Sequence, residues 1–312
     1  MKILFIDNTH PILKEMLEKA GFECDYIVDL TKEKLSEIIS FYNGLIIRSK
    51  ITLNNELLDK ATNLKFVGRV GAGMESIDVE YASKKGIICF NSPEGNRDAV
   101  GEQAAGMLLS LMNNLNKADL EVKKGIWNRE KNRGTEIKGK TIGIIGYGNM
   151  GSSFAKKMSG FESTIIAYDK YKTGFSNDFV KECSLEELFE KVDILSLHVP
   201  LTEETRFMVN QNFINSFKRN IVLINTARGP VIKTADLVTA LKNGKITAAA
   251  LDVLEYEETS FEKMDFSKLP EDFNYLITCQ NVLLSPHIAG WTHESKIKLA
   301  TVLAEKIIKE IK

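Results

Sequence analysis

Residues 141–151, TIGIIGYGNMG, join a short apolar run to three glycines with the spacing GxGxxG. A second apolar run occupies 163–168, and Asp169 closes it. A strand, a glycine turn, a helix, a second strand and an acid in this order are the signature of a dinucleotide-binding site. This context favours such a site over a glycine-rich hairpin. The motif begins only at Thr141, so another domain is expected before it.

Each glycine of the motif has a physical role. Gly146 permits a turn too tight for a side chain, and Gly148 lets backbone N–H groups approach a pyrophosphate. Gly151 lets the following helix pack against its strand. The helix expected over 149–159 then directs its positive N-terminal end at the phosphates.

Asp169 indicates which dinucleotide binds. Its carboxylate can accept hydrogen bonds from both ribose hydroxyls of an adenosine and would repel a 2′-phosphate, so NAD is the expected cofactor. Lys170 and Lys172 stand close by in the sequence and soften the preference for NAD over NADP.

The chain has 312 residues, which is long for a single core and predicts two domains. It contains 44% hydrophobic and 27% charged residues, and its formal net charge is -1. Because no block of like charges stands out, neither a nucleic-acid nor a membrane partner is expected. No apolar run approaches the roughly 20 residues that span a bilayer, and the first five residues indicate a strand rather than a signal peptide.

The cysteines, at positions 24, 89, 183 and 279, lack any metal-ligand spacing. They indicate small buried hydrophobes in a reducing compartment, so we expect a cytoplasmic protein without a metal site. A catalytic cysteine is the less favoured alternative.

Short apolar runs alternate with helical patterns through the first ninety residues, which predicts parallel βα units. The expected strands are 2–6, 24–28, 44–48, 65–69 and 87–90, and the expected helices are 11–20, 31–41, 54–61 and 79–85. Five such strands favour a flavodoxin-like layout. The alternation resumes after the glycine motif, with strands at 193–198, 220–225, 247–253 and 281–284, helices at 184–191, 212–217 and 234–242, and a final amphipathic helix at 292–311.

A long helix is expected over 97–117. Apolar residues surround most of it, which is typical of a helix buried between domains or subunits, and we interpret it as the crossing into the second domain. The prediction is an α/β protein with two doubly wound parallel-sheet domains. A Rossmann NAD-binding domain at 97–286 is inserted in a flavodoxin-like substrate domain formed by 1–96 and 287–312.

Three further segments follow strands of the second domain, at the sheet edge where such folds bind ligands. Arg228 lies on a tight turn before Gly229 and is either a carboxylate-binding group or a surface arginine. The stretch 252–258 holds four acids and is either part of a site or a solvated loop. His287 is either an acid/base or a structural histidine. His198 also ends a strand and is interpreted as lining the cofactor pocket.

Together these motifs resemble the D-isomer-specific 2-hydroxyacid dehydrogenases over essentially the whole chain. The motifs that carry the resemblance are 146–151 (GYGNMG) with Asp169, 225–229 (NTARG), 251–257 (LDVLEYE) and 285–287 (SPH). Within the family, Arg48-Ser49 and 91–96 (NSPEGN) resemble 3-phosphoglycerate dehydrogenases that lack a C-terminal regulatory domain. The chain departs from the family at Ala289, where glycine is common, and at Glu75-Ser76, where Asp-Asn is common.

The resemblance implies a role for each matching residue. Arg228 would bind the substrate carboxylate and polarise the 2-oxo group, His287 would be the acid/base, and Glu257 would pair with His287. Asp252 would meet the nicotinamide end. The residues lining the NAD site would be Gly146, Gly148, Asn149, Met150, Gly151, Asp169, His198, Val199, Pro200, Thr226, Ala227, Arg228, Asp252, His287 and Gly290. The residues contacting the substrate would be Arg48, Ala72, Gly73, Arg228 and His287.

The resemblance also implies a function. The protein would be an NAD-dependent oxidoreductase that transfers a hydride between the nicotinamide and a D-2-hydroxy acid. The leading substrate is 3-phosphoglycerate, in the first step of serine synthesis, and D-lactate, glycerate or hydroxypyruvate, glyoxylate and other 2-oxo acids are alternatives. An NAD(H)-sensing regulatory protein on the same fold is the alternative from another class. A homodimer through the 97–117 region is expected from the resemblance alone.

Overall fold

The structure, a computed structural model, describes residues 1–257 and 269–312. These residues form two compact units, of which unit 1 comprises Met1–Arg97 and Gly290–Lys312, and unit 2 comprises Asp98–Glu257 and 269–289. Each unit is built on its own parallel sheet, which confirms the predicted fold class. The expected domain limits differ slightly, because Arg97 clusters with unit 1 and residues 287–289 cluster with unit 2. The assignment of the substrate to the first domain stays a prediction.

Unit 1 contains five parallel strands in the order β2-β1-β3-β4-β5, which is the flavodoxin-like order. The strands are β1 (Lys2–Phe5), β2 (Glu23–Tyr26), β3 (Gly44–Ile47), β4 (Phe66–Arg69) and β5 (Ile88–Phe90). The helices are α1 (Pro11–Lys19), α2 (Lys32–Ile38), α3 (Asn55–Lys60), α4 (Val79–Lys84) and α12 (His293–Ile311), with short 3-10 turns η1 (Ile39–Phe41) and η2 (Pro93–Gly95).

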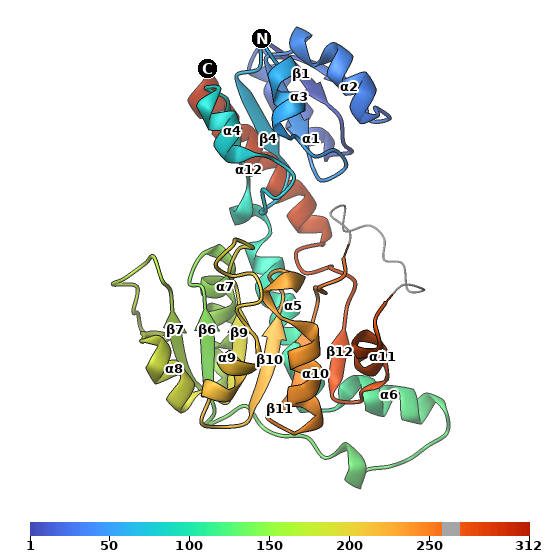
Figure 1. Ribbon diagram of the computed structural model, residues 1–312, viewed down its shortest axis with the longest axis vertical. Helices are drawn as coiled ribbons and strands as arrows, with labels where there is room; N and C mark the ends of the chain where they lie inside the picture. The colour runs from blue at the N-terminus through green and yellow to red at the C-terminus, as the bar shows by residue number, and fades with distance from the viewer. Residues whose placement is uncertain (258–268) are drawn as a thin grey trace. The chain divides into compact units, whose positions relative to one another are not determined.

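Helices cover both faces of this sheet. Because successive residues of a strand point to opposite sides, each strand contributes side chains to both faces. Leu4 and Leu45 pack with α2, α3 and α4 on one face. Ile3 and Ile46 pack with α1 and α12 on the other. The last helix of the chain therefore belongs to the core of the first sheet, as Figure 1 shows by the red α12 beside the blue and cyan elements.

Unit 2 contains seven parallel strands in the order β12-β11-β10-β9-β6-β7-β8, and Figure 1 shows β7 to β12 side by side in this order. The strands are β6 (Thr141–Ile145), β7 (Thr164–Tyr168), β8 (Lys181–Glu182), β9 (Ile194–Leu197), β10 (Ile221–Asn225), β11 (Ile246–Leu251) and β12 (Val282–Leu284). Strand order reverses between β6 and β9, which is the topological switch point of a Rossmann fold.

The sheet of unit 2 is also buried on both sides. One face packs against the four helices α8 (Leu185–Lys191), α9 (Gln211–Ser216), α10 (Thr234–Lys242) and α11 (Glu271–Thr278). The other packs against α5 (Arg97–Met112) and α7 (Asn149–Met158). In β10, Leu223 belongs to the first core and its neighbours Val222 and Ile224 to the second. The sequence patterns did not predict α11 or the short strand β8.

The helix predicted over 97–117 is wrong in its extent. The helix α5 ends at Met112, and a separate helix, α6 (Leu115–Lys123), begins after Asn114. Asn114 adopts a left-handed backbone with φ of 53°, which asparagine tolerates better than most residues. The apolar residues of α5 are accounted for within unit 2, since Ala104, Met107 and Leu108 lie in its core.

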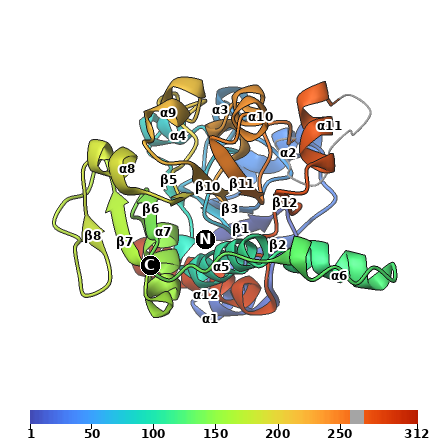
Figure 2. The ribbon, with the colours of Figure 1, turned by 90° about the horizontal axis from the view of Figure 1, so that it is seen from below.

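Helix α6 differs from the other helices of unit 2 because none of its residues is buried. Figure 2 shows α6 continuing beyond α5 and away from the strands of its own unit. In the part of the chain that the structure describes, no helix combines the length and the apolar character that crossing a membrane requires.

Candidate active site

The predicted site residues of unit 2 follow the carboxyl ends of its strands. Gly146 follows β6, Asp169 follows β7, and His198 follows β9. Thr226 follows β10, and Asp252 follows β11. Because parallel strands end at the same edge of a sheet, these residues lie along one edge, where ligands of such sheets bind.

The glycine loop between β6 and α7 has the close approaches that its sequence predicts. Gly146 has a φ of 90°, which few side chains tolerate. A Cβ atom at Gly151 would lie 2.0 Å from the Gly146 carbonyl oxygen, so only glycine lets α7 approach its strand. A Cβ at Gly148 would meet no atom within 4 Å, which leaves open space at this point of the loop.

The N-terminus of α7 is available to an anion. Gly148 occupies the N-cap position and supplies no side-chain acceptor, and the first turn, which begins with Asn149 and Met150, carries no acid. The orphan N–H groups and the helix dipole therefore present partial positive charge beside the open space at Gly148. These residues fit the pyrophosphate of a dinucleotide.

The Asp169 carboxylate is fixed by backbone groups. Its Oδ2 accepts a hydrogen bond of 2.7 Å from the Tyr147 N–H, and its Oδ1 accepts bonds from the N–H groups of Tyr171 and Lys172 at 2.9 and 3.1 Å. A carboxylate has about four acceptor positions, so capacity for a ribose hydroxyl remains. These bonds hold the acid directly beside the glycine loop.

His198 is a neutral group beside the same loop. Its Nε2 lies 2.8 Å from the Ser196 hydroxyl, and its ring lies 5.4 Å from that of Phe154. Burial lowers the pKa of the imidazole to about 3, because the charged form would lose its hydration. Its Nδ1 and the Thr226 hydroxyl are buried without a hydrogen-bond partner among the described residues. Val199 and Pro200 continue from His198 into the following loop.

Arg228 lies on a loop that is held by its neighbours. The buried Asn225 accepts a hydrogen bond from the Ala227 N–H at 3.0 Å and donates one to the Arg228 carbonyl at 2.9 Å. The guanidinium Nη1 of Arg228 donates to the Ala227 carbonyl at 2.6 Å. A Cβ at Gly229 would lie 1.9 Å from the Leu254 carbonyl oxygen, so this loop packs directly on the loop that follows β11.

Asp252 organises the turn that carries His287. Its fully buried carboxylate accepts hydrogen bonds from the Ser285 hydroxyl at 2.6 Å, the Ile288 N–H at 3.0 Å and the Ala289 N–H at 2.7 Å. Its carbonyl accepts a bond of 2.7 Å from the His287 N–H. These bonds stabilise His287 in a left-handed backbone with φ of 53°, a conformation uncommon outside glycine and asparagine.

His287 and Glu257 come together within unit 2. The imidazole Nδ1 lies 2.7 Å from Glu257 Oε2, and the two side chains keep exposed fractions of 21% and 15%. The other carboxylate oxygen of Glu257 accepts a hydrogen bond from the Leu254 N–H. The bond to Glu257 fixes the orientation of the imidazole ring, and Nε2 lies on the opposite side of the ring from Nδ1. A histidine oriented by a carboxylate in this way has the geometry of an acid/base.

The acidic stretch after β11 is not a solvated loop in its described part. Besides Asp252 and Glu257, Glu255 accepts a hydrogen bond of 2.7 Å from the Thr234 N–H at the start of α10. Each of these three carboxylates therefore has a distinct partner. Glu258, the fourth acid of the stretch, lies outside the described residues.

Three predicted site residues of unit 1, Arg48, Ala72 and Gly73, lie beyond the carboxyl ends of its strands. Arg48 follows β3, and its guanidinium lies 4.5 Å from the centre of the Trp291 ring, a cation–π contact. The turn that contains Ala72 and Gly73 is held by a hydrogen bond of 2.7 Å from Asn91 Nδ2 to the Ala72 carbonyl. The buried Gly290 precedes α12 and its carbonyl accepts a bond from Ser295.

Two positioning residues had no role predicted from the sequence. Asn225 and Ser285 stood inside the quoted motifs, yet no role was predicted for either. The available signal was a polar residue at the end of a buried apolar run, since such a residue must find a hydrogen-bond partner. Within the ranges 1–257 and 269–312, no three His, Cys, Asp or Glu side chains gather as a metal site.

Comparison with known proteins identifies the family. Residues 105–289 match the model of the D-isomer specific 2-hydroxyacid dehydrogenase, NAD binding domain. The chain belongs to this family of oxidoreductases, and its residues 105–289 are the family's NAD-binding domain.

The relatives differ in the substrate that their names give. The chain is 37% identical over 315 residues to D-3-phosphoglycerate dehydrogenase of Methanocaldococcus jannaschii, which covers 100% of this chain and 58% of the relative. It is 36% identical over 284 residues to hydroxypyruvate reductase of Thermotoga maritima, with coverage of 90% and 89%. The solved D-lactate dehydrogenase with NAD+ from Lactobacillus jensenii has a TM-score of 0.80, 26% identity and coverage of 100% and 96%. The chain thus spans little more than half of the phosphoglycerate relative.

Proposed function

We propose that the protein is an NAD-dependent dehydrogenase that acts on a D-2-hydroxy acid, with 3-phosphoglycerate as the leading substrate, in the first step of serine synthesis. The observation that carries the chemistry is the pairing of His287 with Glu257, on the same sheet edge as the glycine loop and the Arg228 loop. The similarity to D-3-phosphoglycerate dehydrogenase over the whole chain supports the substrate.

When bound, NAD would accept the hydride from C2 of the hydroxy acid. Nε2 of His287 would take the hydroxyl proton, and the Glu257 carboxylate would stabilise the imidazolium that forms. The Arg228 guanidinium would bind the substrate carboxylate and supply a fixed positive charge beside the reacting oxygen. In the reverse direction the protonated His287 would return its proton to the forming alkoxide.

The cofactor would be held by unit 2. The orphan N–H groups of α7 and the space at Gly148 would receive the pyrophosphate, and Asp169 would accept the ribose hydroxyls. For Arg48, Ala72 and Gly73, the assignment to the substrate stays a prediction.

Hydroxypyruvate is the second candidate substrate. The relative named hydroxypyruvate reductase matches the chain at a similar identity and along 89% of its own length, whereas the phosphoglycerate relative is matched along 58%. The oxo acids of the two candidate reactions, 3-phosphohydroxypyruvate and hydroxypyruvate, differ by a phosphate, so the candidates predict different rates with phosphorylated and unphosphorylated 2-oxo acids.

The test is the rate of NADH oxidation with 3-phosphohydroxypyruvate, hydroxypyruvate and pyruvate, compared as kcat/KM. The leading proposal expects the phosphorylated substrate to be preferred by at least about tenfold, because its phosphate adds a charge-assisted contact. A preference for hydroxypyruvate would favour the second candidate. NADH binding without turnover of any 2-oxo acid would refute both and favour an NAD(H)-sensing regulatory protein.

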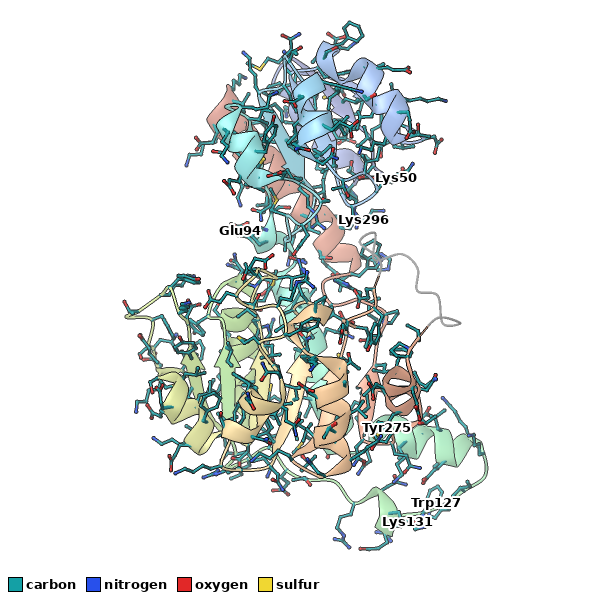
Figure 3. The ribbon with its side chains drawn as sticks, in the orientation of Figure 1. Lys50, Glu94, Trp127, Lys131, Tyr275 and Lys296 are labelled. Atoms are coloured by element: carbon teal, nitrogen blue, oxygen red, sulfur yellow. The ribbon has the colours of Figure 1, made fainter. Side chains whose placement is uncertain are left out.

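We further propose a homodimer whose interface includes α6. Leu115 and Val122, seven residues apart on one face of this helix, are 54% and 52% exposed, and Trp127, just beyond it, is 80% exposed. Figure 3 shows Trp127 and Lys131 on the segment that follows α6, apart from the sheet. An isolated helix of nine residues is marginally stable in water, so an uncovered apolar face of this kind favours burial against a second copy.

Light scattering of the purified protein during gel filtration tests the dimer. The wild type should have twice the chain mass, and Val122→Glu should have the mass of one chain. Lys124→Glu, which introduces the same acid just beyond the helix, should remain dimeric. A monomeric wild type would refute the proposal.

A further inference from the structure

An ion pair beside the predicted ribose acid has no role in the chemistry described above. Lys170, directly after Asp169, pairs with Glu204 from the loop that follows β9. The second carboxylate oxygen of Glu204 accepts a hydrogen bond of 2.7 Å from the Tyr171 hydroxyl. Glu204 thus holds two consecutive residues of the segment that follows the ribose acid.

Stability alone does not account for this pair. The side chains of Lys170 and Glu204 are 54% and 47% exposed, and exposed ion pairs contribute little to folding because water and salt screen them. The loop that presents Glu204 is nevertheless ordered by its own bonds. The Thr205 hydroxyl donates to the Pro200 carbonyl at 2.6 Å, and the Arg206 N–H donates to the Thr202 carbonyl at 2.9 Å.

The position of Lys170 gives the pair a meaning for cofactor choice. In dinucleotide-binding folds, the acid after the second strand accepts the ribose hydroxyls, and a cation close to it accommodates a 2′-phosphate. Lys170 is adjacent to Asp169 in the sequence, and Lys172 lies three positions after it. Lys172 is engaged elsewhere, since its Nζ donates to the Tyr147 carbonyl at 3.4 Å.

We propose that Glu204 determines the specificity for NAD over NADP by engaging Lys170, so that its ammonium group does not receive a 2′-phosphate. This inference rests on the proposed binding of NAD by unit 2. Two residues would then disfavour NADP. Asp169 repels the 2′-phosphate, and Glu204 forms an ion pair with Lys170, the cation that would otherwise attract that phosphate. Lys170 and Lys172 then weaken the preference for NAD over NADP less than their closeness to Asp169 in the sequence indicates.

The charge state of the pair supports this reading. The hydrogen bond with Lys170 lowers the pKa of the Glu204 carboxyl, and the same contact raises the pKa of the Lys170 ammonium group. Both groups are therefore charged at neutral pH, and their charges cancel at the edge of the ribose site.

The test measures the dissociation constants of NADH and NADPH by fluorescence titration of the purified full chain at low ionic strength. Glu204→Gln removes the charge and keeps an acceptor for the Tyr171 hydroxyl. It should tighten NADPH binding by about tenfold, because a charge-assisted contact to phosphate becomes possible, and should change NADH binding by less than about twofold.

Two further variants separate the mechanism from a change in net charge. Glu203→Gln makes the same charge change one residue earlier and should alter NADPH binding by less than about twofold. In a Lys170→Ala background, Glu204→Gln should produce no gain, because the cation that it releases is absent. This double-mutant comparison isolates the action through Lys170.

Three outcomes would overturn the inference. They are an unchanged NADH-to-NADPH ratio in Glu204→Gln, an equal gain in Glu203→Gln, and a full gain in the Lys170→Ala background. Failure of the wild type to bind NADH would instead refute the proposed function, and this inference with it. NADH binding with an unchanged ratio refutes the inference alone.

Discussion

Replacing Glu257 by glutamine should impair the acid/base step of the proposed reaction. The Glu257 carboxylate accepts two hydrogen bonds, one from His287 Nδ1 and one from the Leu254 N–H. The two donors bond to different oxygens, and glutamine replaces one of these oxygens with an NH2 group, so one donor loses its acceptor. Glutamine also lacks the negative charge that would stabilise an imidazolium when His287 takes the substrate proton.

The magnitude follows from these two losses. A hydrogen bond to a charged group contributes about 1.5–3 kcal/mol and one between neutral groups about 0.5–1.5 kcal/mol, so loss of the charge removes about 1 kcal/mol. A donor left without an acceptor costs about 1–3 kcal/mol more. Because both side chains retain some exposure, we take the lower end, about 2 kcal/mol in the transition state, which lowers kcat about 30-fold.

The assay is kcat for oxidation of the preferred 2-hydroxy acid, with NADH affinity and the melting temperature measured on the same samples. Glu255→Gln is the matched control. It removes the same charge two residues from Glu257, and the Glu255 carboxylate bonds the Thr234 N–H rather than His287. Its kcat should stay within about threefold of wild type. A folded Glu257→Gln enzyme with kcat within threefold of wild type would refute the reasoning.

Three other predictions use the same geometry. His287→Gln should lower turnover by about 100-fold or more while NADH binding stays nearly unchanged, and near-normal turnover would reject the assignment. Gly151→Ala, whose Cβ would lie 2.0 Å from the Gly146 carbonyl oxygen, should lower the free energy of unfolding by about 3 kcal/mol in urea titrations. Gly148→Ala should keep that stability and weaken NADH binding, so equally stable alanine variants would contradict the packing argument. His198 has a folded pKa of about 3, below its ordinary 6.5, so its stabilising effect is complete above pH 6.5 and is lost as pH falls toward 3. Wild type should therefore lose about 2 kcal/mol more than His198→Gln between pH 7 and pH 5, and identical losses would count against a buried neutral imidazole.

The fold could be predicted from local patterns because each βα unit has a recognisable apolar run and helical pattern within a short stretch of sequence. The glycine motif located β6, α7 and β7, and the apolar runs located the remaining long strands. The errors occurred where a local pattern did not determine the outcome. The break between α5 and α6 depends on the left-handed backbone of Asn114, and an asparagine in an otherwise helical pattern does not require it.

The site residues could be named from their motifs, and the family resemblance predicted that Glu257 pairs with His287, but the partners of Asp252 and Glu255 could not be assigned. Asp252, Glu255 and Glu257 are similar acids within six positions, and spacing does not say which one meets the histidine. The structure distinguishes them by what lies opposite each carboxylate: the turn after β12, the start of α10, and the imidazole. These partners lie twenty or more residues away in the chain, so only the assembled sheet brings them into reach.

Asp252 and Glu257 hold different parts of the segment that carries His287. Asp252 and Glu257 bond to the same histidine segment, one through the backbone of its turn and the other through the ring. A left-handed histidine costs conformational energy that the surrounding structure must offset, about 1 kcal/mol or more. The three bonds that the Asp252 carboxylate accepts, with the bond from the His287 N–H to its carbonyl, supply that offset and fix the direction in which the ring leaves the backbone. Glu257 then has to fix only the rotation of the ring. Two carboxylates are needed because a single acid cannot hold both the backbone of the turn and the imidazole nitrogen.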